Sequence, residues 1–265
     1  MLMNFIAKKS LGQNFLNDKK IINKISELGE ISNNDLVIEV GPGTGNLTEK
    51  LLEKEPRELI VIEKDKRLLE LLNNKFGDKI VIFNEDMMNF PFDNYINKNT
   101  IIFGNLPYNI STQILAKWIK MKHIDKICKK FILMFQKEVA DRIVAKYNTK
   151  NYGRLSILSN WRMEIERILD VDPKSFKPSP KIKSTLLVLI PKKKYHNIQD
   201  PRKLEHITNV FFNQKRKMIK KPMKTLFKDF DSISKKLSLE LNLRPQNLEL
   251  VTYYKICEMY EKLIN

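Results

Sequence analysis

The stretch Asn105-Leu106-Pro107-Tyr108 combines side chains that could do chemistry, and it comes directly after an apolar run, TIIFG at 100–104. The Asn105 side-chain oxygen and the neighbouring Leu106 backbone carbonyl are both hydrogen-bond acceptors. Pro107 would hold them in place, because proline locks its own φ and restricts the residue before it. Tyr108 adds a flat aromatic face. The motif also suits an ordinary turn with a packed tyrosine, so it does not decide a function by itself.

A second candidate is the loop EVGPGTG at 39–45, which lies between an apolar run and a helical pattern. Glycine lets a backbone turn sharply and approach a ligand, and the N-terminus of the following helix offers free N–H groups. The glycines stand at positions 41, 43 and 45, so the GxGxxG spacing of a dinucleotide site is absent. No Lys-Ser/Thr pair follows, which excludes a nucleoside-triphosphate P-loop.

Polar side chains follow three successive apolar runs. Glu63 ends the second run, Asp86 follows the third, and Asn105 ends the fourth. In a parallel sheet these positions meet at the carboxyl edge, where ligands bind. Glu63 can accept the two hydroxyls of a ribose, and Asp86 can accept the exocyclic amine of an adenine. Together with the glycine loop, the three positions predict a site for an adenosyl ligand.

The elements that must position these residues alternate in type. Short apolar runs rich in Ile and Val predict strands at 36–40, 59–63, 79–84, 100–104 and 130–136. Helical patterns occur at 19–28, 46–55, 66–76 and 111–122. Continuous apolar strands alternating with amphipathic helices predict an α/β fold with a mainly parallel sheet covered on both faces. For the helix at 19–28 we expect Asn17 or Asp18 as N-cap and Gly29 as the stop.

The second half of the chain predicts a different organisation. Helical residues at 153–161 precede two predicted strands at 163–171 and 184–190, with an extended KPSPK segment between them. The proline-bounded segment 191–201 suggests a linker. Helical patterns then run to the end of the chain, at 202–212, 215–228, 231–242 and 248–264. We therefore predict two domains, at 1–191 and 192–265.

The charge indicates a polyanionic partner. The formal net charge is +17 with a pI near 9.6, and residues 192–228 contain 10 Lys and 2 Arg against only Asp200 and Glu205. This concentration favours nucleic acid binding. No apolar run approaches the roughly 20 residues that span a bilayer, and the N-terminus lacks a signal-peptide core, so we expect a cytoplasmic protein. Cys128 and Cys257 lie far apart, and the three histidines share no metal-like spacing, so we expect neither a disulfide nor a metal.

Six blocks of the sequence resemble those of a known family. They are SLGQNFL (10–16), FGNLPYNIS (103–111), QKEVADR (136–142), YGRLS (152–156), FKPSPKIKST (176–185) and NQKRK (213–217). In this order they resemble the KsgA family of small-subunit ribosomal RNA adenine dimethyltransferases. The resemblance implies a class I S-adenosylmethionine methyltransferase fold, Rossmann-like with a mainly parallel seven-stranded sheet, and a small C-terminal helical RNA-binding domain. It also implies dimethylation of N6 on two adjacent adenosines in the 3′-terminal hairpin of 16S rRNA, and a role in ribosome biogenesis.

The resemblance assigns roles by position. Together with the glycine loop, it implies cofactor contacts from Asn14, Leu16, Gly41, Gly43, Gly45, Glu63, Asp86 and Asn105. The catalytic clamp on the target amine would comprise Asn105, Leu106, Pro107 and Tyr108, with Phe176 stacking on the base opposite Tyr108. The RNA backbone would be bound by Lys215, Arg216, Lys217, Lys220 and Lys221. The continuation MIKKPMK departs from the family, which places the local helix geometry in question.

Two alternatives remain open from the sequence. Large-subunit rRNA methyltransferases of the macrolide-resistance type are similar, but they typically carry Ile where this chain has Leu106. The second alternative is a relative that binds nucleic acid without catalysing methyl transfer. The presence of Glu63, Asp86 and the NLPY motif argues against such a loss of activity. The partner expected from the resemblance is small-subunit rRNA, in a partly assembled subunit, bound by a monomer.

Overall fold

The computed structural model describes residues 7–8, 11–97 and 99–264, and they pack into two units. The first unit contains the described residues up to Ala140 together with Glu164–Pro191. The second contains Asp141–Met163 and the chain from Lys192 onward. The sequence-based division at residue 191 had assigned 141–163 to the N-terminal domain. In the structure this segment packs with the C-terminal helices.

The first unit is built on a seven-stranded sheet in the order β4-β3-β2-β5-β6-β9-β7. Neighbouring strands from β4 to β6 are parallel, and β9 is antiparallel to β6. The strands are β2 (Leu36–Val40), β3 (Glu58–Glu63), β4 (Val81–Asn84), β5 (Thr100–Asn105), β6 (Lys130–Gln136), β7 (Met163–Val171) and β9 (Ser184–Pro191). The predicted α/β fold with a mainly parallel sheet is therefore confirmed.

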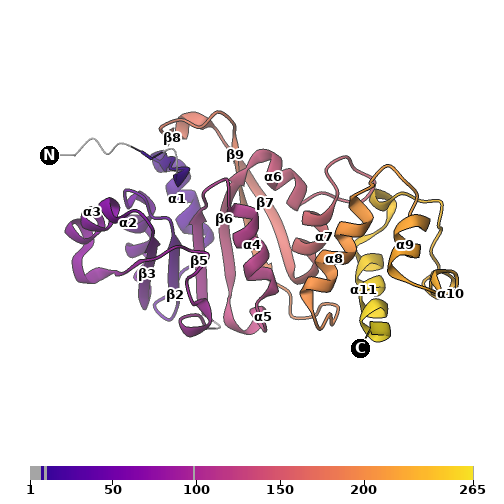
Figure 1. The fold of residues 1–265 in the computed structure, drawn as a ribbon. Helices are drawn as coiled ribbons and strands as arrows, with labels where there is room; N and C mark the ends of the chain where they lie inside the picture. Colours follow the sequence, from indigo (N-terminus) through magenta and orange to yellow (C-terminus); the bar gives the residue numbers. More distant parts are fainter. Residues whose placement is uncertain (1–6, 9–10, 98, 265) are drawn as a thin grey trace. The chain divides into compact units, whose positions relative to one another are not determined.

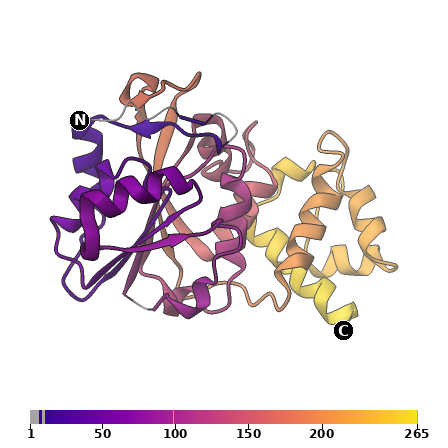
Figure 2. The ribbon, with the colours of Figure 1, turned by 60° about the vertical axis from the view of Figure 1, so that its left-hand side comes forward.

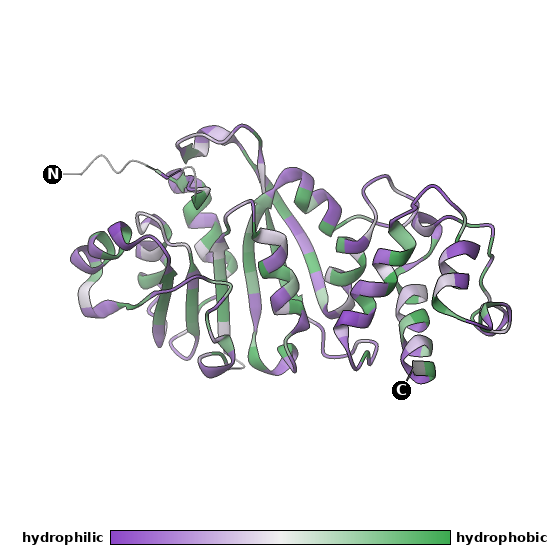
Figure 3. Ribbon diagram, in the orientation of Figure 1, coloured by the Kyte–Doolittle hydropathy of each residue, from purple (hydrophilic) through white to green (hydrophobic). Residues whose placement is uncertain are grey.

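Helices cover both faces of this sheet (Figure 1, Figure 2). All five residues of β2 are buried, as expected for a strand with no solvent face, and Figure 3 shows hydrophobic residues concentrated along the central strands. The helices of this part of the chain are α1 (Lys19–Leu28), α2 (Asn46–Leu52), α3 (Lys66–Phe76), α4 (Ser111–Lys120), α5 (Ile124–Ile127) and α6 (Lys137–Ile143). Helices α5 and α6 were not predicted: α5 has only four residues, too few to show a period, and α6 follows β6 with no intervening residue.

A small second sheet fixes the N-terminal segment. Strand β1 (Phe15–Leu16) pairs antiparallel with β8 (Phe176–Lys177). Beside it, the Asn17 N–H donates to the Ser175 carbonyl at 2.9 Å, and the Ser175 hydroxyl donates to Asp18 at 2.9 Å. Asp18 is the N-cap of α1, where its side chain also accepts two backbone N–H bonds. Two-residue strands carry no periodicity, so this pairing could not be expected from sequence.

The second unit is helical. Its helices are α7 (Arg154–Arg162), α8 (Pro201–Phe212), α9 (Lys220–Leu226), α10 (Phe230–Lys236) and α11 (Leu250–Ile264). The Tyr254 hydroxyl on α11 donates to the Ile157 carbonyl on α7 at 2.9 Å.

Short 3₁₀ turns occur in the chain at Gly77–Lys79, Phe92–Asn94, Pro173–Ser175 and Pro245–Asn247. Within the described residues, no helix is both long and apolar enough to cross a membrane.

The single helix predicted over 215–228 is wrong. Residues 213–217 form turns, and α9 begins only at Lys220. The reason is Pro222, which lacks a backbone N–H and clashes with a preceding helical turn, but is tolerated within the first turn of a helix. The helix therefore starts just before the proline, and the basic loop stays outside it.

Candidate active site

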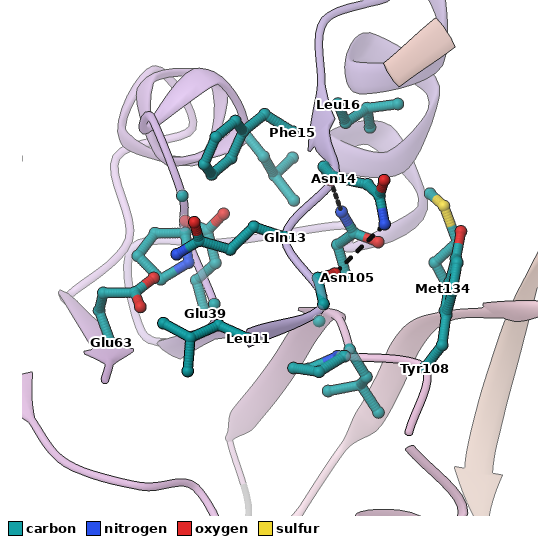
Figure 4. Close-up of a pocket in the computed structure, with 18 of the residues that line it drawn as sticks. Leu11, Gln13, Asn14, Phe15, Leu16, Glu39, Glu63, Asn105, Tyr108 and Met134 are labelled. Atoms are coloured by element: carbon teal, nitrogen blue, oxygen red, sulfur yellow. Dashed lines mark hydrogen bonds between the residues drawn. The ribbon is translucent and has the colours of Figure 1, made fainter. Parts of the chain in front are cut away.

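A pocket opens where the sheet changes direction. The chain passes from β2 to β3 on one side and later to β5 on the other, which makes the carboxyl ends of β2 and β5 the switch point where ligands bind. The pocket is lined by residues 11–16, by the glycine loop at 41–44, by residues 104–110, and by side chains at the ends of β2 and β3 (Figure 4). Residue Ser10 of the predicted SLGQNFL block lies outside the described residues.

The glycine loop needs its glycines for two reasons. Gly41, Gly43 and Gly45 all have positive φ, at 69°, 57° and 77°. At Gly43 a Cβ atom would also lie 2.7 Å from Phe15 Cδ1, so the ring of the N-terminal segment occupies that space. Gly41 and Gly43 line the pocket. Gly45 is not part of its lining; it is the N-cap of α2, where a Cβ would meet Phe76 at 2.6 Å.

Two carboxylates line the predicted adenosyl end of the pocket. Glu63 is buried at the end of β3, and burial raises its pKa, while one carboxylate oxygen accepts the Asp65 N–H at 2.8 Å. Asp86 accepts the Lys64 ammonium at 2.7 Å and the Met88 N–H at 2.9 Å. The Lys64 bond lowers the pKa of Asp86, which keeps it ionised and purely an acceptor.

The N-terminal segment supplies the opposite wall. Asn14 and Leu16 both line the pocket. The Asn14 amide donates to the Gly12 carbonyl at 3.2 Å, and its own backbone carbonyl accepts the Asn105 side-chain amide at 2.9 Å (Figure 4). Residues 91 positions apart in the chain therefore meet in one hydrogen bond at the pocket wall.

The NLPY motif begins at Asn105, the last residue of β5, and all four of its residues line the pocket. Because the Asn105 Nδ2 donates to Asn14, the amide is oriented with its Oδ1 as the remaining acceptor. In the described part of the chain no hydrogen bond to this oxygen or to the Leu106 carbonyl is recorded. The Tyr108 hydroxyl lies 2.6 Å from the Ser184 hydroxyl, which fixes the edge of the ring. Burial raises the pKa of Tyr108, so it stays protonated.

The structure does not bring Phe176 to this pocket. Its side chain is only 4% exposed and packs in the hydrophobic core with Leu16, its partner in the small sheet, and with Val171. It is not among the residues that line the pocket. A stacking role for Phe176 therefore stays a prediction, and it requires the ring to leave the core.

Sequence reasoning missed a network around Asp65, whose side chain is 1% exposed. Asp65 accepts the Gln13 amide at 2.9 Å and the Arg67 guanidinium at 2.6 Å, and the Arg67 bond holds its pKa well below the usual range. Its backbone N–H donates to Glu63. Gln13 lines the pocket, so this network joins the N-terminal segment to the acidic strand end. An Asp just before a helical pattern is typical of an N-cap, so the sequence pattern does not indicate that Asp65 also binds Gln13.

Glu39 is a further pocket residue that the sequence did not single out. It is buried on β2, its carboxylate accepts the Thr48 hydroxyl at 2.6 Å, and it contributes to the pocket lining. Burial raises its pKa to about 7. The carboxyl therefore gains or loses a proton near neutral pH.

The basic residues predicted to bind RNA lie in the second unit. Arg216 and Lys217 are exposed in the turn segment that follows α8, and Lys215 beside them donates to the Lys150 carbonyl at 3.0 Å. Lys220 and Lys221 are exposed in the first turn of α9. The predicted residues thus occupy one loop and the start of the next helix.

The fold and pocket define a class I S-adenosylmethionine-dependent methyltransferase: a seven-stranded, mainly parallel sheet with a glycine loop and acidic strand ends at its switch point. The chain belongs to the ribosomal RNA adenine dimethylase family, whose profile matches residues 4–264. The family assignment made from the sequence blocks is confirmed.

Similar proteins cover nearly the whole chain. A protein of Pelagibacter ubique named ribosomal RNA small subunit methyltransferase A is 48% identical over 97% of this chain and 98% of its own length. A protein of the same name from Ehrlichia canis is 38% identical over 94% of this chain and 95% of its own length.

Among solved structures, a dimethyladenosine transferase from Plasmodium falciparum matches with a TM-score of 0.78 and 24% identity, covering 94% of this chain and 98% of that one. The 23S rRNA methyltransferase ErmE matches with a TM-score of 0.69 and 22% identity, covering 94% and 100%. At these identities the two structures show a shared fold.

Proposed function

We propose that this protein dimethylates N6 of two adjacent adenosines in the 3′-terminal hairpin of 16S rRNA, with S-adenosylmethionine as methyl donor. Family membership and the names of the similar proteins support the reaction and the small-subunit target. The structural observation that carries the proposal is the orientation of the Asn105 amide. Its nitrogen is committed to the Asn14 carbonyl, so its oxygen is left to accept a hydrogen bond from an amine in the pocket.

The residues present fit the cofactor. Gly41 and Gly43 let the backbone approach a ligand closely, and Phe15 covers the position that a Cβ at Gly43 would fill. Glu63 would accept the ribose hydroxyls, and the ionised Asp86 would accept the adenine amine. Asn14, Leu16 and Asn105 complete the assigned contacts, and Gly45 supports the loop from outside the pocket.

The target base would be held by the NLPY motif. The lone pair of an adenine N6 amine is delocalised into the ring, so the amine is a poor nucleophile that depends on positioning. The Asn105 Oδ1 and the Leu106 carbonyl would accept its two hydrogens, and Pro107 would keep these acceptors fixed. The Tyr108 ring, anchored by Ser184, would stack on the base that has been turned out of the RNA. Bound S-adenosylmethionine supplies an activated methyl group, and the methylated amine can then lose its proton to water, so no general base is required of these side chains.

The two predicted domains would have different roles. Residues 1–191 would bind the cofactor and the target base, and residues 192–265 would bind the RNA backbone. Lys215, Arg216, Lys217, Lys220 and Lys221 would contact phosphates, which position the RNA without reading its sequence. We further propose that the substrate is a partly assembled small subunit, that the protein acts as a cytoplasmic monomer, and that it takes part in small-subunit biogenesis.

The test is methyl transfer from labelled S-adenosylmethionine to unmethylated small and large ribosomal subunits, followed by nucleoside mass spectrometry. Dimethyladenosine in small-subunit RNA is expected. Product only in large-subunit RNA would identify the macrolide-resistance type of activity. No product, together with no cofactor binding by calorimetry, would favour the non-catalytic alternative. Naked 16S rRNA in parallel would show whether assembly is required.

A further inference from the structure

Tyr147 stands apart from the other tyrosines of the protein. All eight tyrosines lie in the described part of the chain, and seven of them have a hydrogen-bond or ring partner: Tyr95, Tyr108, Tyr152, Tyr195, Tyr253, Tyr254 and Tyr260. For Tyr147 no such partner is recorded among the described residues, and its side chain is 43% exposed. The loop between α6 and α7 therefore presents a partly exposed aromatic residue to solvent.

The loop that carries Tyr147 is held in place on both sides. The Asn148 N–H donates to the Gln246 carbonyl at 2.8 Å, and the Asn247 amide donates to the Asn148 side chain at 2.7 Å. The Lys150 carbonyl accepts the Lys215 ammonium at 3.0 Å. A ring on a fixed loop loses little conformational freedom when it binds a ligand, because its backbone is already ordered.

The same contacts bring two acid-free basic segments together. Residues 142–163 contain five Lys and Arg and no Asp or Glu, and residues 206–228 contain seven Lys and Arg and no Asp or Glu. Lys215 touches the first segment at Lys150, and Arg154 donates to Asn209 at 2.9 Å. Twelve positive charges therefore lie on two adjoining segments of the second unit, and all of them except the buried Arg162 are at least partly exposed. Exposed aromatic rings among basic side chains are typical of surfaces that bind unpaired nucleotides.

We propose that Tyr147 stacks on an unpaired base of the RNA substrate, while Lys146 and Lys150 contact the adjoining phosphates. This base-contact site in the second unit is separate from the methylation pocket. The proposal rests on the proposed function, since it takes RNA as the partner of the basic segments. It adds a preference for unpaired over duplex RNA, because a duplex buries its base faces in its own stack.

The experiment measures binding of the full-length protein to a hairpin RNA with an unpaired loop and to a blunt duplex RNA of equal phosphate number. Tyr147→Ala should weaken hairpin binding by roughly 5- to 150-fold, with an unchanged salt slope, and should leave duplex binding unaltered. Tyr147→Phe keeps the ring and should bind like the wild type. Leu263→Ala is the control for the loss of an exposed apolar side chain, since Leu263 is 60% exposed near the end of α11 in the same unit. Lys150→Ala should reduce the salt slope by about 1.

The outcomes separate this proposal from the one on which it rests. If Tyr147→Ala weakens hairpin and duplex binding equally, stacking is refuted. Stacking is also refuted if Tyr147→Ala binds the hairpin as tightly as the wild type while a triple variant of Lys215, Arg216 and Lys217 binds it more weakly. Unchanged binding by both variants would also refute it and would move the RNA surface out of the second unit. In each of these cases, methyl transfer to small-subunit RNA in the assay above would still support the proposed function.

Discussion

Gly43 offers a quantitative test of how the N-terminal segment closes the cofactor pocket. Gly43→Ala introduces two separate penalties. A left-handed φ of 57° costs an L-residue about 1–2 kcal/mol. The new Cβ would also lie 2.7 Å from Phe15 Cδ1, whereas carbon atoms are at their best about 3.5–4.0 Å apart, so the ring must move by about 1 Å.

The second penalty should appear in cofactor binding. Forced overpacking typically costs about 1–3 kcal/mol, which corresponds to roughly 5- to 150-fold in an equilibrium constant. Relief comes when Phe15 and the adjoining Asn14 withdraw from the pocket, and Asn14 is the residue that orients Asn105. We therefore expect weaker S-adenosylmethionine binding by calorimetry and a lower rate of methyl transfer.

Gly77→Ala is the control for a positive φ without a steric clash. Gly77 has a φ of 53° with a ψ of −133°, and no atom lies within 4 Å of the position that a Cβ would take. Both variants should lose stability in urea unfolding, and only Gly43→Ala should lose cofactor affinity. In a Phe15→Ala background, Gly43→Ala should have little further effect on cofactor affinity, whereas the loss of stability caused by its positive φ should remain. Additive losses in that double variant, or wild-type cofactor affinity in Gly43→Ala, would refute the role given to the Phe15 contact.

Three other predictions address the target clamp, the buried carboxyl and the RNA surface. Asn105→Ala should lower methyl transfer by about 10²–10³-fold, as for the loss of a preorganised hydrogen-bonding group, and spare RNA binding; equal loss of both would make Asn105 structural. Glu39 has its pKa raised from 4.5 to about 7, so the folded state binds this proton more tightly and stability falls as pH rises through that window. Glu39→Gln should remove a fall of about 3 kcal/mol between pH 4.5 and 7 in urea unfolding, and identical pH profiles would contradict this. Replacing Lys215, Arg216 and Lys217 together with Ala should weaken RNA binding and reduce its salt slope by up to about 3, whereas an unchanged slope would place the RNA surface elsewhere.

The parts of the fold that the sequence predicts well are those with strong periodicity or a unique backbone requirement. The runs LVIEV and TIIFG become β2 and β5, and their ends place the glycine loop and Asn105 at one switch point. Asp18 caps α1 as expected. In these cases local chemistry and the tertiary fold favour the same structure.

The parts that sequence could not supply depend on contacts between distant residues. Asp65 looks like a helix cap, and only the fold shows that it also binds Gln13, 52 residues away. Phe176 lies in a motif associated with base stacking, but its pairing with Leu16 buries the ring. Nothing in the local pattern of either residue records its partner.

The link between Asn14 and Asn105 has a consequence for the order in which the enzyme is made. Residues 11–16 are synthesised before their hydrogen-bond partner at residue 105 and their strand partner at 176–177. At about 5–20 residues per second, roughly 8–33 s of translation separate the first of these residues from the last. A nascent chain that ends before residue 176 lacks the strand that pairs with residues 15–16. The segment that orients Asn105 is therefore fixed only when most of the first unit has been translated.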